Sequence, residues 1–178
     1  MKIPLLPFAV VLALAASVTF APAQTASMPK TGDKAPLVQG QDQDGKTWKL
    51  TDDLGKKVVL LYFYPKDETP GCTKEACNFR DNITELKDSG VKVIGVSFDS
   101  AESHQKFIKT HDLNFPLIAD TDGKIADAYG VRMKGKDMAH RVSFLIGRDG
   151  KIIHVTNSGD ADKHLAEMKA AVAGLKKS

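Results

Sequence analysis

The segment from Val58 to Tyr64 restricts the possible folds more than any other part of the chain. It reads VVLLYFY, an unbroken run of apolar, β-branched and aromatic residues. Such a run is typical of a strand that is buried on both faces, as strands are when helices cover both sides of a parallel sheet. A second run, from Val91 to Phe98, has the same character. We therefore expect a layered α/β protein with these two strands at its centre.

Helical patterns separate the expected strands. Between the two strands, apolar residues within 70–88 recur every three or four positions, as they do on the buried face of a helix. After the second strand, Asp99 and Glu102 have the spacing of a capping box, which predicts a helix that continues to about His111. This alternation of strands and helices predicts that the central strands are parallel.

The remaining segments complete the pattern. Asp44-Gly45, between two short apolar segments, predicts a hairpin ahead of the first central strand. After His111 we expect a short strand, a short helix, a hairpin and a final helix, at 115–119, 125–129, 142–155 and around the apolar positions Leu165, Met168, Val172 and Leu175. The order predicts a central mixed β-sheet flanked by helices, with an antiparallel edge, and resembles the thioredoxin-like fold.

The first 23 residues differ from the rest of the chain. Lys2 precedes an almost wholly apolar stretch from Ile3 to Phe20, and Ala21-Pro22-Ala23 offers the small residues that a signal peptidase recognises. This pattern is typical of a secretory signal peptide. An uncleaved membrane anchor is the alternative, because the apolar run approaches the length of a membrane span. Two prolines and the small residues at its end favour cleavage.

We therefore expect an exported, periplasmic protein without stable membrane association after cleavage. Residues 24–35 lack large apolar side chains and are expected to form a flexible N-terminus, followed by one domain over 36–178. The chain has 42% hydrophobic residues, enough for a core, and a formal charge of only +3. Because its basic residues do not gather around aromatic ones, nucleic acid is not an expected partner.

The chain contains two cysteines, Cys72 and Cys77. Two cysteines in an exported protein usually form a disulfide. These lie only five positions apart, so a bridge between them would close a very small loop and add little stability through chain entropy. A purely structural disulfide is therefore the weaker interpretation.

Cys72 is expected in the first turn of a helix. Thr69 is a favourable N-cap residue and Pro70 is suited to the first helical position, which makes Cys72 the third residue. The backbone N–H groups of a first turn have no helical partners and the helix dipole is positive there, so a thiolate is stabilised. A thiolate is the nucleophilic form of cysteine. Its small or polar neighbours argue against an inert cysteine in an apolar pocket.

Cys77 is expected on the same helix. Five residues of regular helix give a rise of about 7.5 Å and a rotation of about 140°, which places the two Cα atoms roughly 8–9 Å apart. That separation is beyond the reach of a disulfide. Either the helix is absent, or it unwinds locally after Cys72 has been oxidised, so that Cys77 condenses with the sulfenic acid. We favour the second alternative.

This segment resembles the active-site region of peroxiredoxins, specifically of the peroxiredoxin Q group, also called bacterioferritin comigratory proteins. The family pattern P-x-x-x-T/S-x-x-C is present from Pro65 to Cys72, and the subgroup signature TPGCTKEACNFRD extends from Thr69 to Asp81. The resemblance runs from about Gly32 to the end of the chain. It implies that Cys72 is the peroxidatic cysteine and Cys77 the resolving cysteine.

The resemblance also implies supporting roles. Thr69 would hydrogen-bond the thiolate and the peroxide, and Pro65 would shield the site from water. Arg141 matches the arginine that such enzymes hold beside the thiolate, where a permanent charge favours the thiolate and polarises the O–O bond. Glu75 matches a glutamate that orients these groups. Without the resemblance, Arg141 could be a surface residue and Glu75 one more solvated helix residue.

The expected function is a thiol-dependent peroxidase that reduces hydrogen peroxide and organic hydroperoxides. A thioredoxin-like dithiol protein would reopen the disulfide, no cofactor or metal is expected, and the resemblance favours a monomer. A copper-binding protein of the Sco type is the alternative, although its cysteines are closer and the Arg141 charge would repel a cation beside His140. A thioredoxin-type disulfide exchanger would need a C-x-x-C spacing.

Overall fold

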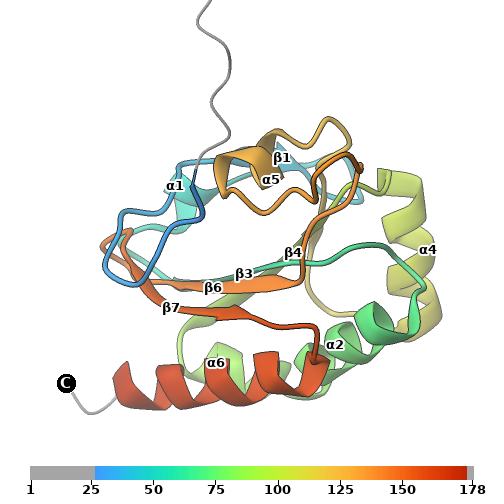
Figure 1. Ribbon diagram of the computed structural model, residues 1–178. Helices are drawn as coiled ribbons and strands as arrows, with labels where there is room; N and C mark the ends of the chain where they lie inside the picture. Colours follow the sequence, from blue (N-terminus) through green and yellow to red (C-terminus); the bar gives the residue numbers. More distant parts are fainter. Residues whose placement is uncertain (1–26, 176–178) are drawn as a thin grey trace, which may run out of the picture.

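The computed structural model describes residues 27–175, so the predicted signal peptide lies outside the described residues. A five-stranded mixed sheet forms its centre, in the order β5-β4-β3-β6-β7 (Figure 1). The strands are β3 (Val58–Phe63), β4 (Val91–Ser97), β5 (Leu117–Ala119), β6 (Val142–Ile146) and β7 (Ile152–Asn157). β3, β4 and β5 are parallel, whereas β6 and β7 add an antiparallel edge. The predicted α/β class and mixed sheet are confirmed.

Helices and a hairpin cover the two faces of this sheet (Figure 1). On one face lie α2 (Pro70–Asp81), α3 (Ile83–Asp88), α4 (Ala101–His111) and α6 (Ala161–Leu175). On the other lie α1 (Leu50–Asp53), α5 (Lys124–Ala128) and the hairpin of β1 (Gln39–Gln41) and β2 (Thr47–Lys49). The predicted hairpin turn is confirmed, with Gly45 at a φ of 74° that a glycine adopts without strain.

The unbroken apolar run of β3 follows from this layering. Successive side chains of a strand point to opposite faces of its sheet. Val59, Leu61 and Phe63 therefore enter the core under α1 and α5, whereas Leu60 and Tyr62 enter the core under α2 and α6. All five are fully buried. β3 thus separates two hydrophobic cores. The segment after its C-terminal end is where α/β sheets usually have their functional site.

Two of the predicted helices differ in detail. The helical pattern over 70–88 is interrupted at Asn82, which separates α2 from α3 and whose side-chain amide donates to the Asn78 carbonyl at 2.9 Å. The predicted capping box at Asp99 is wrong, because Ser100 is the N-cap of α4 and accepts from the Ser103 N–H. Asp99 is engaged elsewhere, by the Ser97 hydroxyl at 2.7 Å.

The buried face of α6 also differs from the prediction. The buried positions include His164, Met168 and Val172, whereas Leu165 is half-buried and Leu175 is 37% exposed. Met168 and Val172 would be buried whether the buried face of the helix included the two leucines or His164. The apolar residues alone therefore predict a buried face with Leu165 and Leu175. The observed rotation instead turns His164 toward the sheet and toward α2, which lies beside α6 (Figure 1).

Part of the segment that we expected to be flexible is bound to the sheet. The Gly32 N–H donates to the Ile152 carbonyl, and the Asp33 carbonyl accepts from the Ile152 N–H, each at 2.8 Å. Ala35 is buried and donates to the Gly150 carbonyl. Residues 32–35 therefore belong to the folded domain. Within 27–175, no helix has the length and apolar character needed to cross a membrane.

The packing between β4 and β3 predicts a strong effect of one methyl group. A Cβ atom on Gly95 would lie 2.5 Å from Leu117 Cδ2 and 2.8 Å from the Tyr62 hydroxyl. We expect Gly95→Ala to lower the free energy of unfolding by about 1–3 kcal/mol, measured by urea denaturation. Gly174→Ala is the control, because a Cβ there meets nothing within 4 Å and the helix gains about 0.5–1 kcal/mol. Equal stability of Gly95→Ala and the parent would contradict this packing.

Candidate active site

Cys72 lies where the sequence places it, in the first turn of α2. The helix begins at Pro70, directly after the N-cap Thr69, so Cys72 is its third residue. The side chain is buried, with only 1% of the residue exposed, and it belongs to the core under α2 and α6. The small and polar sequence neighbours of Cys72 argued against an apolar pocket, and that expectation is wrong. The helix N-terminus and a positive side chain nearby nevertheless suit a thiolate.

That positive side chain is Arg141. It directly precedes β6, the neighbour of β3 in the sheet, and its Nη2 donates to Cys72 Sγ at 3.3 Å. The Arg141 side chain is almost buried, at 10% exposure. Burial opposes its charge, but the Glu75 carboxylate and the Cys72 sulfur raise the pKa of Arg141 above its ordinary value. Arg141 is therefore a permanent cation in direct contact with the sulfur.

Glu75 is buried as well and is no solvated helix residue. It lies three positions after Cys72, about one turn along α2, and its Oε2 accepts from Arg141 Nη1. Burial raises the pKa of Glu75 to about 7, although Arg141 lowers it through its charge and its hydrogen bond. Close to neutral pH, this carboxyl group can therefore hold or release a proton.

Two further polar side chains complete the buried cluster, and the sequence analysis missed both. His164 Nδ1 on α6 lies 3.3 Å from Glu75 Oε1 and 2.7 Å from the Ser143 hydroxyl of β6. Both residues are fully buried. Their positions are 92 and 71 residues after Cys72, so no local motif connects them with it. The available signal was the four-residue spacing of His164 from Met168 on the apolar face of the last helix.

Cys77 lies on α2 with Cys72, and both are free thiols in the structure. The helix is continuous between them, so the helical separation of about 8–9 Å between their Cα atoms applies. Cys77 is half-buried and lies farther along the helix than Glu75. The structure thus shows the folded-helix state that we expected before oxidation.

Thr69 and Pro65 lie in the segment between β3 and α2. Thr69 occupies the N-cap position, but its hydroxyl donates to the Lys66 carbonyl at 2.9 Å and makes no side-chain cap. The hydroxyl is thus used to hold the turn, and its predicted contact with the thiolate stays a prediction. Pro65 is half-buried and lines a pocket of about 260 Å³ together with Lys66, Phe98 and Met138.

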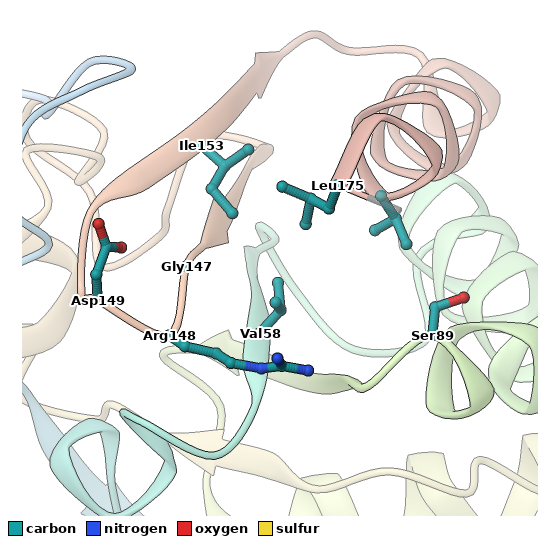
Figure 2. Close-up of a pocket in the computed structure, with 8 residues that line it drawn as sticks. Val58, Ser89, Gly147, Arg148, Asp149, Ile153 and Leu175 are labelled. Atoms are coloured by element: carbon teal, nitrogen blue, oxygen red, sulfur yellow. The ribbon is translucent and has the colours of Figure 1, made fainter. Parts of the chain in front are cut away.

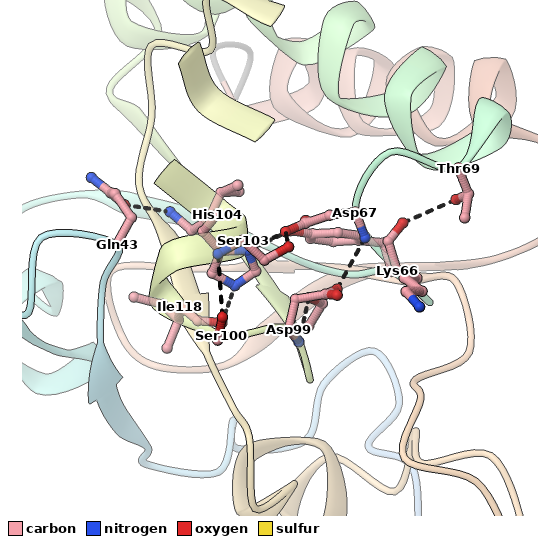
Figure 3. A network of polar contacts seen from close by, with 12 residues as sticks. Gln43, Lys66, Asp67, Thr69, Asp99, Ser100, Ser103, His104 and Ile118 are labelled. Carbon is pink, nitrogen blue, oxygen red and sulfur yellow. Dashed lines mark hydrogen bonds and ion pairs between the residues drawn. The ribbon is translucent and has the colours of Figure 1, made fainter. Parts of the chain in front are cut away.

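A buried ion pair anchors this segment to α4 (Figure 3). Asp67 Oδ2 contacts His104 Nδ1 at 2.9 Å and the Ser103 hydroxyl at 2.7 Å, and Tyr64 donates to Oδ1 at 2.8 Å. Burial alone would raise the pKa of Asp67, but the His104 hydrogen bond and charge and the two hydroxyl groups lower it below its ordinary value. The carboxylate therefore stays charged and fixes the loop that presents Thr69.

Pockets elsewhere in the structure do not serve this cluster. A pocket of about 510 Å³ lies at the beginning of β3, the opposite end of the strand from α2, and is lined by Val58, Arg148 and Ile153 among others (Figure 2). Among residues 27–175, no group of three or more histidine, cysteine or acidic side chains is arranged to hold a metal ion.

Comparisons with known proteins agree with this geometry. The profile of the AhpC/TSA family matches residues 31–155. Peroxiredoxin Bcp of Escherichia coli K12 is 46% identical over 141 residues, which cover 76% of this chain and 90% of the relative. These matches give no support to the copper-binding alternative.

Solved structures give the same result. The crystal structure of peroxidoxin BcpB from Mycobacterium tuberculosis has a TM-score of 0.77 and 35% identity, and the match covers 82% of this chain and 97% of that one. The bacterioferritin comigratory protein of Xanthomonas campestris, described for its alkyl peroxide reduction activity, has a TM-score of 0.66 and 32% identity. That match covers 76% of this chain and 92% of the other.

The ion pair that anchors the loop predicts a pH-dependent loss of stability. Asp67→Asn removes one partner of a buried pair, and we expect the free energy of unfolding at pH 7 to fall by about 3 kcal/mol. Because the pKa of Asp67 is lowered in the folded state, its stabilisation is present above about pH 4 and is lost as the pH falls through that lowered value. The stabilities of parent and variant should therefore begin to approach each other below about pH 4 and converge only once the pH has fallen below that lowered pKa. Asp88→Asn, at an exposed position, serves as the control, and a pH-independent difference would contradict the account.

Proposed function

The chain belongs to the AhpC/TSA family, as a peroxiredoxin of the Bcp or Q type, and on this basis we propose how its two cysteines divide the reduction of a peroxide. One observation carries the proposal. A buried, permanently charged guanidinium donates to the Cys72 sulfur at 3.3 Å, at the N-terminus of a helix whose next turns carry Cys77. Cys72 is the attacking thiolate and Cys77 the second thiol.

In the first step, the Cys72 thiolate attacks one oxygen of the peroxide. An S–O bond forms as the O–O bond breaks, so that the sulfur is oxidised to a sulfenic acid and the leaving oxygen departs as water or an alcohol after protonation. Arg141 stabilises the negative charge that passes from sulfur to the leaving oxygen. The relative from Xanthomonas campestris supports organic hydroperoxides as substrates beside hydrogen peroxide.

In the second step, the Cys77 thiolate attacks the sulfenic sulfur and releases hydroxide, which leaves as water after protonation. The step needs local unwinding of α2, because a regular helix keeps the sulfurs apart. Contacts to neighbouring helices resist this unwinding. Asp162 of α6 accepts from Lys74 at 2.6 Å and from Asn78 at 3.0 Å, and Arg80 donates to the His111 carbonyl of α4 at 2.6 Å.

A dithiol protein of the thioredoxin type reduces the Cys72–Cys77 disulfide in the last step of the cycle. We propose that the enzyme acts as a monomer, since Cys72, Arg141, Glu75 and His164 all come from one chain. We also propose that it works in the periplasm after removal of residues 1–23. The sequence at Ala21-Pro22-Ala23 supports cleavage there, and the reductant would then be a thioredoxin-like protein outside the cytoplasm.

Substitution of each cysteine separates the two steps. Stopped-flow reduction of hydrogen peroxide by the reduced protein should be abolished in Cys72→Ser. Cys77→Ser should keep the rate of the first step within about a factor of two but stop turnover with a dithiol reductant, because no disulfide forms. Mass spectrometry should then find a sulfenic or overoxidised Cys72. Unchanged peroxide reduction in Cys72→Ser would disprove the proposal.

The proposal of export has its own test. Expression of the full chain in a Gram-negative host, followed by periplasmic extraction and N-terminal sequencing, should give a mature protein that begins at Gln24. Ala23→Asp should block cleavage, whereas Ala26→Asp, three positions beyond the predicted site, is the control. Recovery of uncleaved chain from the membrane would identify the segment as an anchor instead.

A further inference from the structure

We propose that His111 is a positioning residue of this peroxidase, which holds both ends of α2 and so delays the unwinding that brings Cys77 to the oxidised Cys72. The inference rests on the proposed function for the second step of the cycle. It gives α4, which carries neither cysteine, a part in the timing of the reaction.

His111 is the last residue of α4, and it contacts both ends of α2. Its Nε2 lies 2.9 Å from Glu68 Oε2, and Glu68 directly precedes the N-cap Thr69. Its backbone carbonyl accepts from Nη1 of Arg80, in the last turn of α2, at 2.6 Å. We call these two contacts the His111 link. Both cysteines lie between the two points at which the link holds the chain.

The His111 ring is held in place by its own helix. It packs edge-on against the Phe107 ring, one turn earlier, with the ring centroids 5.1 Å apart. Phe107 is fully buried in the core under α2 and α6. Two turns before His111, on the same face of α4, His104 holds Asp67 in the buried ion pair (Figure 3). α4 thus holds two consecutive acidic residues of the loop before α2.

The backbone of Glu68 shows that this loop needs to be held. Its φ is 59°, in the left-handed region that a residue with a side chain adopts only at a cost in free energy. Such a conformation persists where the surrounding contacts determine it. Here the contacts of Asp67 determine it on one side and the His111 link on the other. Loss of the link would therefore let the loop relax, and the first turn of α2 with it.

The link also covers Cys77. Long side chains of a helix lean toward its N-terminus, so the Arg80 side chain lies over the turn that carries Cys77, three positions earlier. The Asp81 hydrogen bond raises the pKa of Arg80 above its ordinary value against the effect of burial, and the charge of a Cys77 thiolate adds to that rise. Cys77 thus lies on the side of α2 that faces α4, and it has to leave that side to reach Cys72.

The link and the helix depend on each other. α2 has twelve residues, which make about 18 Å of regular helix. Glu68 and Arg80 both reach His111 only while the helix keeps their spacing. An unwound segment has no fixed distance between its ends, so unwinding breaks at least one of the two contacts. The link therefore stabilises the folded helix and slows the second step, while the surroundings of the Cys72 sulfur stay unchanged.

Amide hydrogen exchange of residues 73–80 in the reduced protein measures the opening of α2 without a peroxide. Glu68→Leu removes the acceptor, and His111→Phe removes the ring nitrogens but keeps an aromatic ring against Phe107. We expect either variant to lower the protection by about threefold to fivefold, the effect of one partly exposed pair. Glu68→Gln keeps an oxygen that accepts from Nε2, and its protection should stay near the parent value.

A double variant distinguishes one link from two independent contacts. Arg80→Leu removes the other half of the link and should lower the protection by a similar factor. Because one broken contact already releases an end of α2, Glu68→Leu combined with Arg80→Leu should open the helix no more than the larger single effect. Independent contacts would multiply to about ninefold or more. His154→Phe is the matched control, since His154 pairs with Glu167 at 3.2 Å but lies on β7, and its protection should equal that of the parent.

The rate of the second step tests the consequence for the reaction. After mixing with stoichiometric hydrogen peroxide, acid quenching and mass spectrometry follow the conversion of the Cys72 sulfenic acid to the disulfide. His111→Phe and Glu68→Leu should speed this conversion by the factor by which they open the helix. The first step should stay within about a factor of two of the parent. A general structural defect would instead slow both steps.

Each outcome decides the matter. Unchanged protection in the folded single variants, multiplied effects in the double variant, or a second step that is unchanged or slower would overturn the inference. If the parent formed no disulfide with peroxide while the protection fell as expected, the proposed function would fail and the role of the link in holding α2 would stand. If His111→Phe does not fold, Glu68→Leu decides, because the Glu68 side chain is 50% exposed.

Discussion

The contact between the Arg141 guanidinium and the Cys72 sulfur is the interaction on which the rest of the site depends. A buried cation is costly unless it is paired, and here its partners are the sulfur and Glu75. Arg141 can reach both because β6 lies beside β3 in the sheet, while α2 starts just after the end of β3. The order of the strands therefore brings the Arg141 guanidinium to the Cys72 sulfur. The helix N-terminus adds a second, weaker source of positive potential at the same atom.

The helix α2 has to be folded for the first step of the cycle and unwound for the second. While it is folded, it holds Cys72 beside Arg141 and Glu75 beside His164, and it keeps Cys77 out of reach. To complete the cycle, it has to give up these contacts and the hydrogen bonds to α4 and α6. Ala76 and Phe79 hold α2 in place through its buried face, whereas the pair of Lys74 and Asp162 lies near the surface, with both side chains more than half exposed. Exposed pairs of this kind contribute little stability, so the cost of local unwinding lies mainly in the buried face of α2.

Sequence patterns predicted the parts of this architecture that depend on local rules. The unbroken run of β3, the Thr69-Pro70 start of α2 and the first-turn position of Cys72 all follow from burial and capping preferences. Arg141 and Glu75 came from the family resemblance alone. Periodicity could not find His164, Ser143 or the Asp67–His104 pair, because it shows which face of an element is buried but not which polar atoms meet there. The cap at Ser100 was missed for a similar reason, since Asp99 Oδ2 accepts from the Ser97 hydroxyl and, in a tertiary contact, from the Asp67 N–H.

The central claim is that the α2 segment is helical in the reduced enzyme and unwound in the disulfide form. Amide hydrogen exchange of residues 73–80 tests it most directly, in the reduced protein and after stoichiometric oxidation by peroxide. The account predicts protected amides in the reduced state and a loss of protection by at least about tenfold on oxidation, confined to α2 and its contacts, while β3 and β6 stay protected. Equal protection of residues 73–80 in both states, with the Cys72–Cys77 disulfide verified by mass, would contradict it.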